Sequence, residues 1–216
     1  LAEKLDDRYL TAYAFQALGC SQILRSEFDE AERSFEKCYA IYEALDKTSE
    51  LAMTVGDLGL AIGYQGDIHR ANDLLEHNWS LIERLEDIRT KAHLLLIAGG
   101  VKVPLGEWQI ATDMLRQCVL LSRQVNNALL IGDALILLAG AANGENMPIR
   151  AARLYGASEV VHESIGAIMD PGFRHYYSIF VEQTRTMLDE STFAAAWAEG
   201  RKMTMEQAIQ YALNEE

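Results

Sequence analysis

The sequence predicts an all-α protein built as an array of about four antiparallel helix pairs, followed by a helical cap. Three observations support this. The 216 residues contain only three prolines, at positions 104, 148 and 171. Apolar residues recur at three- and four-residue spacing, as in helices with one buried face. The chain also resembles itself when it is shifted by about 40 residues, which is typical of repeat architectures.

The 40-residue period brings small residues into shared positions. Three such positions read Gly19, Gly59, Gly99, Ala139; Ala31, Ala71, Ala111, Ala151; and Ala12, Ala52, Ala92, Gly132. Large apolar residues share others: Phe15, Val55, Leu95, Leu135; Phe35, Leu75, Leu115, Tyr155; and Leu45, Leu85, Val125, Ile165. Small residues let two helix backbones approach closely, while large ones interdigitate beside them. Because one pair cannot bury its own apolar face, successive pairs are expected to stack.

The turns inside each pair follow the same period. Ser26, Gly66, Gly106 and Asn146 align, and glycine or asparagine is favoured at the left-handed position that ends a helix. Acidic residues follow three of these four positions, where they suit the positive end of the next helix. Each unit is therefore expected to be a helix, a tight turn and a second helix.

The four units are expected at about 9–46, 49–86, 89–125 and 128–166, so that residues 1–170 form the repeats. First helices are expected near 8–25, 49–65, 89–104 and 127–143, and second helices near 28–46, 68–86, 108–125 and 148–166. Pro148 fits the first position of a helix, where a missing N–H costs nothing, and Pro104 ends another. The helix at 127–143 is apolar almost all round and is expected to be the most buried.

Residues 171–216 leave the repeat register and are expected to form the cap. Helices are expected near 173–189 and 191–200, and Thr204 with Gln207 forms a possible capping box that opens a last helix to about 213. Four aromatic residues of this segment are expected to form the core of the cap: Tyr176, Tyr177, Phe180 and Trp197. The alternative is an exposed contact patch.

Composition excludes several classes of protein. The net charge of −13 argues against nucleic-acid binding, which requires a basic surface. The longest apolar stretch, 128–142, is too short to span a membrane and contains Asp133. No secretory leader is visible, and the absence of Met at position 1 suggests a fragment of a longer protein. Three cysteines without a CxxC motif fit a reducing compartment, hence a cytoplasmic location.

Two resemblances follow from these residues. The spacing Leu18-Gly19, Ala31, Phe35, repeated at Leu58-Gly59, Ala71, Leu75, resembles the tetratricopeptide repeat. The 40-residue period of this chain is longer than the usual unit of that family, which has about 34 residues. That resemblance implies a right-handed superhelix. The stretches 151–166 and 193–213 look like the C-terminal end of bacterial signal-transduction ATPases and transcriptional regulators of the MalT and LuxR type. Because the chain has no phosphate-binding loop and no basic recognition helix, the resemblance implies only a sensor or docking region that restrains an ATPase domain upstream.

The residues with catalytic or metal-binding chemistry form no recognisable constellation. The histidines at 69, 77, 93, 162 and 175 show no HExxH motif or His–Cys cluster, so no catalytic residue, metal or cofactor is predicted. Cys38 and Cys118 share one repeat position and are expected to fill the core, as is Cys20.

A groove along the concave side of the first helices is the predicted binding site. Asp133 lies inside the most apolar helix, at the repeat position shared by Tyr13, Met53 and His93, and a His93–Asp133 pair is expected on adjacent units. The pair is either a buried structural contact or a polar anchor in the groove. The predicted groove residues are Tyr13, Gln16, Met53, Tyr64, His93, Leu96, Asp133 and Asn143, with small or apolar residues between them at Cys20, Leu60, Gly100, Ile136 and Gly140.

This lining predicts a protein, a peptide helix or a small effector as the ligand, with no direct contact to nucleic acid or membrane. The favoured function is a non-catalytic interaction or sensor region of a larger bacterial regulator, whose upstream ATPase domain is the expected partner in cis. A homo-oligomer is also possible. One alternative is a plain scaffold for protein assembly, and a more distant one is a helical enzyme using His93 and Asp133.

Overall fold

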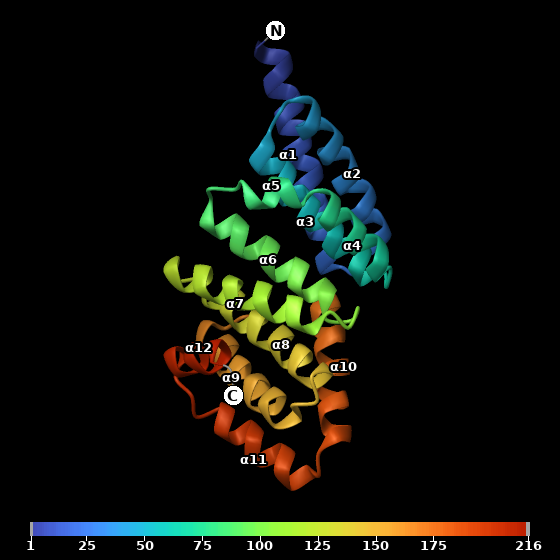
Figure 1. The fold of residues 1–216 in the computed structure, drawn as a ribbon. Helices are drawn as coiled ribbons and strands as arrows, with labels where there is room; N and C mark the ends of the chain where they lie inside the picture. The colour runs from blue at the N-terminus through green and yellow to red at the C-terminus, as the bar shows by residue number, and fades with distance from the viewer. Residues whose placement is uncertain (1, 215–216) are drawn as a thin grey trace. The chain divides into compact units, whose positions relative to one another are not determined.

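The computed structural model describes the backbone of residues 2–214 and the side chains of residues 7–214. Within this range every regular element is a helix, so the all-α prediction is confirmed (Figure 1). The two helices of each predicted pair pack against each other, as expected for antiparallel helix pairs. The chain divides into two compact units: unit 1 comprises 1–86 with 170–172, and unit 2 comprises 87–169 with 173–216.

Unit 1 contains the first two predicted helix pairs. Its helices are α1 (Ala2–Leu24), α2 (Phe28–Ala44), α3 (Thr48–Tyr64), α4 (Ile68–His77) and α5 (Trp79–Glu83). Helix α2 packs against both α1 and α3, and α4 packs against α3. The predicted order of first and second helices is therefore the observed one.

Unit 2 contains the other two pairs and the tail. The pairs are α6 (Ile88–Lys102) with α7 (Trp108–Gln124), and α8 (Ala128–Gly144) with α9 (Pro148–Ile165). The tail forms α10 (Pro171–Met187), α11 (Glu190–Gly200) and α12 (Met205–Leu213). Pro148 opens α9 at its first turn, and Thr204 with Gln207 forms the predicted capping box of α12. Both local predictions are confirmed.

Left-handed residues mark the turns at a regular spacing of half the repeat period. In the described chain, positive φ angles occur at Ser26, Asp46, Gly66, Gly106, Asn126, Asn146 and Gly166. The four turns predicted inside the pairs are among them. The other three end second helices and were not predicted, although aspartate, asparagine and glycine are the residues that tolerate this conformation best.

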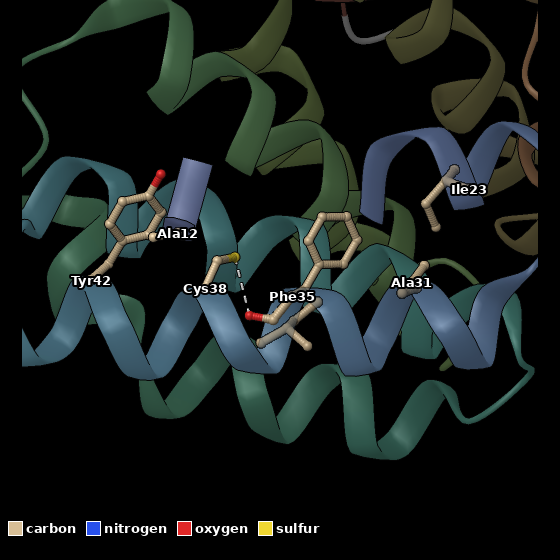
Figure 2. Close-up of a cluster of buried hydrophobic side chains, with 8 residues drawn as sticks. Ala12, Ile23, Ala31, Phe35, Cys38 and Tyr42 are labelled. Atoms are coloured by element: carbon tan, nitrogen blue, oxygen red, sulfur yellow. Dashed lines mark hydrogen bonds between the residues drawn. The ribbon is translucent and has the colours of Figure 1, made fainter. Parts of the chain in front are cut away.

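The close helix approaches that the small residues predicted are present inside the first three pairs. A Cβ on Gly19 would lie 2.5 Å from the Phe35 ring, and one on Gly99 would lie 2.7 Å from Leu115. Gly59 and Leu75 make the same contact with slightly more room, at 3.3 Å. In unit 1 this packing forms a core cluster that includes Ala12, Ile23, Ala31, Phe35, Cys38 and Tyr42 (Figure 2).

The second helix predicted at 68–86 is wrong as a single element. It is broken into α4 and α5 at Asn78, whose buried side-chain amide donates to the carbonyl of Leu74 at 2.9 Å. Asparagine competes with helical hydrogen bonding in this way. The same segment ends at Glu86, where the regular series of left-handed residues is interrupted and where the two units divide.

The tail packs on several sides of the last helix pair. Helix α11 crosses α9 at two glycines: Cβ atoms on Gly156 and Gly200 would lie 2.2 and 2.0 Å from backbone carbonyl oxygens of the opposite helix. Arg150 donates to the carbonyls of Tyr211, Ala212 and Asn214, so that a cation meets the C-terminal end of α12.

The aromatic residues of the tail pack on the repeats, as the core-of-the-cap prediction requires. The rings of Tyr177 and Trp197 lie 5.7 and 6.1 Å from that of Tyr155, which is fully buried on α9. Phe180 is buried as well, with the ring of Tyr176 at 6.3 Å.

Two further predictions have definite outcomes. No helix in the described part of the chain is long and apolar enough to cross a membrane. Cys38 and Cys118 are buried core residues, as predicted, but Cys20 is exposed because α1 has no helix over that side in the structure.

Candidate functional site

Gln16 lies in a chain of polar contacts inside unit 1. Its amide nitrogen donates to the Asp57 carboxylate at 3.1 Å, and its amide oxygen accepts from the Tyr42 hydroxyl at 3.2 Å. Asp57 is 7% exposed, and burial raises the pKa of its carboxyl to about 6, although the bond from Gln16 acts in the opposite direction. Gln16 therefore supports a buried acid besides facing the predicted groove.

Tyr13 and Met53 form the accessible part of the predicted groove in unit 1. The bonds from Tyr9 to Glu50 and from Gln16 to Asp57 both join residues 41 positions apart, so Tyr13 on α1 lies opposite Met53 and Thr54 on α3. Tyr13 is 60% exposed, and Met53 is half-buried. An exposed tyrosine beside a methionine and an amide is typical of protein-binding surfaces.

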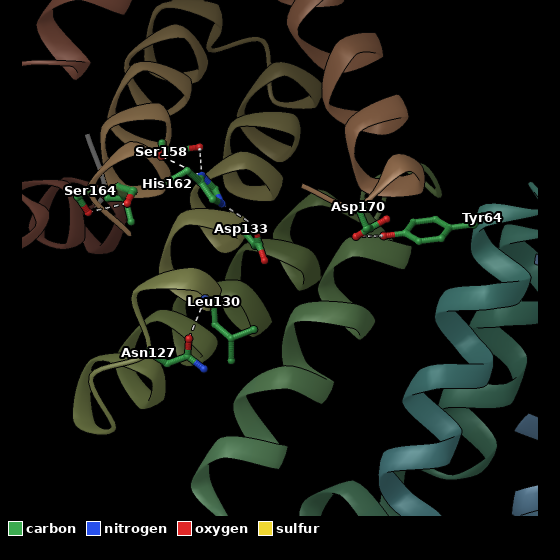
Figure 3. A network of polar contacts seen from close by, with 9 residues as sticks. Tyr64, Asn127, Leu130, Asp133, Ser158, His162, Ser164 and Asp170 are labelled. Carbon is green, nitrogen blue, oxygen red and sulfur yellow. Dashed lines mark hydrogen bonds and ion pairs between the residues drawn. The ribbon is translucent and has the colours of Figure 1, made fainter. Parts of the chain in front are cut away.

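Tyr64, also in unit 1, is already in contact with the chain's own segment 170–172. Its hydroxyl donates to Asp170 at 3.3 Å (Figure 3), and a Cβ on Gly172 would lie 2.4 Å from its ring. The Phe28 ring lies 5.3 Å from that of Tyr64. This groove residue is therefore covered from within the chain.

Asp133 in unit 2 pairs with His162. The Nε2 atom of His162 lies 2.9 Å from a carboxylate oxygen of Asp133, and its Nδ1 atom lies 2.9 Å from the Ser158 carbonyl (Figure 3). Both ring nitrogens face acceptors, so the protonated imidazolium satisfies both contacts. Burial lowers the pKa of His162, but the hydrogen bond and the charge of Asp133 outweigh it, and the net pKa is raised.

The ring of His162 rests on the backbone of α8. A Cβ on Gly132 would lie 2.7 Å from this ring, which explains why the alanine position of the other three units is glycine here. Asp133 is thus held by His162, where the sequence suggested His93. This contact favours the structural interpretation of Asp133 over the polar anchor.

The other predicted groove residues on α6 are less accessible than Tyr13. His93 is half-buried, and burial lowers its pKa, which favours the neutral ring. Leu96 is buried. These two positions therefore offer a ligand less surface than the matching positions of unit 1.

Asn143 and Gly140 contact the chain's own helix α10. The amide nitrogen of Asn143 donates to the Phe180 carbonyl at 3.2 Å and to the Thr184 hydroxyl at 2.6 Å. A Cβ on Gly140 would lie 3.3 Å from the Phe180 ring. Both residues were predicted to line the groove. In unit 2 they are covered by α10 of the same chain.

Two cavities lie among other residues. One of about 430 Å³ in unit 1 is lined by Glu36, Leu58, Ile62, Arg70, Asp73, Leu74, His77 and Asn78. One of about 160 Å³ in unit 2 is lined by Gln109, Thr112, Arg116, Leu138, Ala142, Glu145, Met147 and Arg150. Among the described residues, no three His, Cys, Asp or Glu side chains are grouped so that they could hold a metal ion.

Comparison with known proteins gives no relative: no protein-family model matches the chain, and a search of the curated proteins finds no match. The structure itself defines the class. The chain is an all-α helical-repeat protein, in which helix pairs that follow the 40-residue period are joined to a helical C-terminal segment.

The sequence analysis missed Asp57 and His162, and both had a detectable signal. Asp57 follows glycine within an apolar helix, as Asp133 does. His162 is an ionisable residue at a repeat position that the other three units fill with Tyr42, Ile82 and Ser122. All three of these residues are buried. Attention to polar residues at buried repeat positions would have found them.

Proposed function

We propose that the chain is a non-catalytic protein-interaction region that binds a helical segment of a partner protein on Tyr13, Gln16 and Met53 of unit 1. The observation that carries this proposal is the seating of α10 in unit 2. There, the Phe180 ring of α10 packs closely on Gly140, and the side chain of Asn143 donates to a carbonyl of α10.

The groove positions of unit 1 offer related chemistry. Tyr13 supplies an exposed aromatic surface, Met53 an adaptable apolar one, and Gln16 a polar side chain. Tyrosine and methionine contribute contact area at interfaces. A partner helix with an apolar stripe fits this lining better than a phosphate or a nucleic acid.

The resemblance of the tail to bacterial regulators supports a narrower proposal. In that reading the partner is an ATPase domain of the same cytoplasmic regulator, and binding shifts the domain between two states. ATP hydrolysis by such a regulator should change when Tyr13 and Met53 are replaced in its repeat region. If the chain is instead a plain scaffold, the same replacements should leave ATP hydrolysis unchanged and alter the assembly of its protein partners.

The enzyme alternative relied on a single residue pair. It required His93 and Asp133 to act together, whereas Asp133 is bonded to His162. Replacing His93 by alanine should therefore leave any activity of the protein unchanged.

The binding proposal can be tested with displayed peptides selected on the wild-type chain, each about 15–20 residues long so that it can form a helix. The Tyr13→Ala/Met53→Ala variant should bind the selected peptides at least about tenfold more weakly, as when interface hot spots are truncated. Ile168→Ala is the matched control, because Ile168 is 85% exposed and is not one of the predicted groove residues. Equal affinity of the double variant and the wild type would contradict the proposal.

A further inference from the structure

Helix α1 has an exposed face that lacks charge. Between Tyr9 and Leu24 it contains no Asp, Glu, Lys or Arg, although a quarter of the whole chain is charged. Large apolar side chains are exposed along it: Leu10 at 60%, Leu18 at 44% and Leu24 at 64%. A helix surface of this composition is typical of a contact with another protein element.

The repeat register identifies this face. Ala14, Ala17, Leu18 and Ser21 are all exposed on α1. Their counterparts one period later, on α3, are all buried: Thr54, Asp57, Leu58 and Ala61. Three periods later, on α8, the counterparts are buried as well: Ala134, Leu137, Leu138 and Ala141. Helix α3 packs on α2, and α8 packs on α7, the second helix of the preceding pair in each case. We call Ala14, Ala17, Leu18, Ser21 and Leu24 the stacking face of α1.

The end of the stacking face has its own recurring contact. Phe28, the first residue of α2, lies against Tyr64 in the last turn of α3, with ring centroids 5.3 Å apart. Trp108, the first residue of α7, lies against Gly144 in the last turn of α8, where a Cβ would be 2.3 Å from the indole. The equivalent of Tyr64 and Gly144 on α1 is Leu24, which is 64% exposed.

The last pair shows the contrasting situation. Its second helix α9 is covered by α11, which approaches it closely at Gly156 and Gly200. The chain thus supplies its own cover for α9, whereas α1 shows its stacking face to solvent.

We propose that the stacking face of α1 binds the second helix of another 40-residue helix pair of the same kind, with the aromatic first residue of that helix on Leu24. The binding mode continues the α2–α3 and α7–α8 interfaces by one step. Tyr13 borders this face, because Ala17 lies one turn further along α1, whereas Met53 lies on α3. The variants Leu18→Glu and Tyr13→Ala/Met53→Ala therefore test the two proposals separately.

The test adds such a pair to the chain in place of residues 1–7, and the parent for comparison begins at residue 8. Residues 87–127, which contain α6, α7 and the turn that leads into α8, are joined as a second copy directly to residue 8, the register equivalent of residue 128. The fusion should melt at least about 5 °C above the parent chain, because apolar surface of α1 becomes buried.

Leu18→Glu provides the decisive comparison. In the parent chain Leu18 is exposed, so the substitution should shift the melting temperature by no more than about 1 °C. In the fusion it should remove most of the gain, while Ile168→Glu, at a site 85% exposed, should leave the gain intact. Absence of a gain, or a gain that survives Leu18→Glu, would overturn the proposal.

Sedimentation of the parent chain tests the competing occupant. We expect a monomer with and without Leu18→Glu. A wild-type dimer that Leu18→Glu disperses would assign the stacking face to a second copy of the chain and refute the occupant proposed here.

Discussion

Each unit has an aspartate in an apolar first helix, buried in unit 1 and half-buried in unit 2, and the two carboxylates have different partners. In unit 1, Asp57 receives a bond from the neutral amide of Gln16, and burial raises its pKa to about 6. In unit 2, Asp133 meets the imidazole of His162, whose pKa is raised by the carboxylate. The partner decides whether a buried acid costs stability at neutral pH or forms an ion pair.

The units also differ in whether their outermost helix is covered by another helix. Unit 2 covers its last second helix with α11 through glycine contacts, whereas unit 1 exposes the stacking face of α1. Single substitutions can alter a close backbone contact, a buried charge or a turn conformation. Each is compared with a control substitution elsewhere in the chain.

Replacing Gly156 by alanine should cause the largest loss of stability. The new Cβ would lie 2.2 Å from the Trp197 carbonyl oxygen, and neither backbone can move without separating α9 from α11. We expect a loss of about 3–5 kcal/mol in the free energy of unfolding, measured by urea denaturation. Gly63→Ala in unit 1 is the control, since its nearest neighbour would be 4.0 Å away. Similar free energies for both variants would disprove the tight crossing.

Replacing His162 by alanine should destabilise unit 2 by about 2–4 kcal/mol at pH 6, because it leaves Asp133 without its cation and opens a cavity over Gly132. The wild-type pair has a pH dependence of defined sign. A raised histidine pKa stabilises the fold fully below the unfolded value of about 6.5, and this stabilisation is lost as the pH rises through the folded value.

The difference in unfolding free energy between wild type and His162→Ala should therefore shrink as the pH increases from 6 to 9. His175→Ala is the control, because His175 is exposed. A difference that stays constant over this range would show that the imidazolium charge contributes nothing.

Asp57→Asn should stabilise unit 1 at neutral pH. The folded pKa of about 6 lies above the ordinary value of 3.8, so the fold binds the proton more tightly and its stability falls as the pH rises from about 4 to 6. The neutral amide removes this cost, and we expect a gain of about 2–3 kcal/mol at pH 7.5 and almost none at pH 4. Asp73→Asn, at an exposed site, should change little at either pH. Destabilisation by Asp57→Asn at pH 7.5 would mean that the charge itself is needed.

Ser26→Gly should have the smallest effect, a gain of up to about 1 kcal/mol. Ser26 has a φ of 60°, a conformation that costs a residue with a Cβ more than it costs glycine, and the greater chain entropy of unfolded glycine offsets part of the gain. Glu86→Gly tests the interruption of the series, because Glu86 is not among the positive-φ residues. It should give no gain, and an equal gain at both positions would show that a left-handed turn also forms at 86.

Local sequence signals were sufficient for most helices because the turns are encoded by single residues. Gly66, Gly106, Ser26 and Asn146 hold the left-handed positions that the 40-residue alignment indicated, and Pro148 opens its helix as expected. The break at Asn78 was missed because helix periodicity continues through it. Its cause is a side-chain bond to Leu74, which only the folded helix reveals.

The candidate site was predicted less completely, since periodicity fixes a position on a helix and leaves the neighbour undetermined. In unit 1, Tyr13 is exposed and Met53 is half-buried. The sequence alone suggested His93 as the partner of Asp133, but His162 from α9 reaches it because Gly132 leaves room for the ring. Likewise, nothing in the repeat pattern indicated that α10 would fill the groove positions at Gly140 and Asn143.

By itself, therefore, the sequence determined the all-α class, the helix pairs and their turns, because these depend on residues close together in the chain. The tertiary structure decided which buried acid is neutralised, which groove positions are filled and which helix face is bare. Those outcomes depend on contacts between residues as far apart as Asp133 and His162, or Asn143 and Thr184, whose energies no local pattern records.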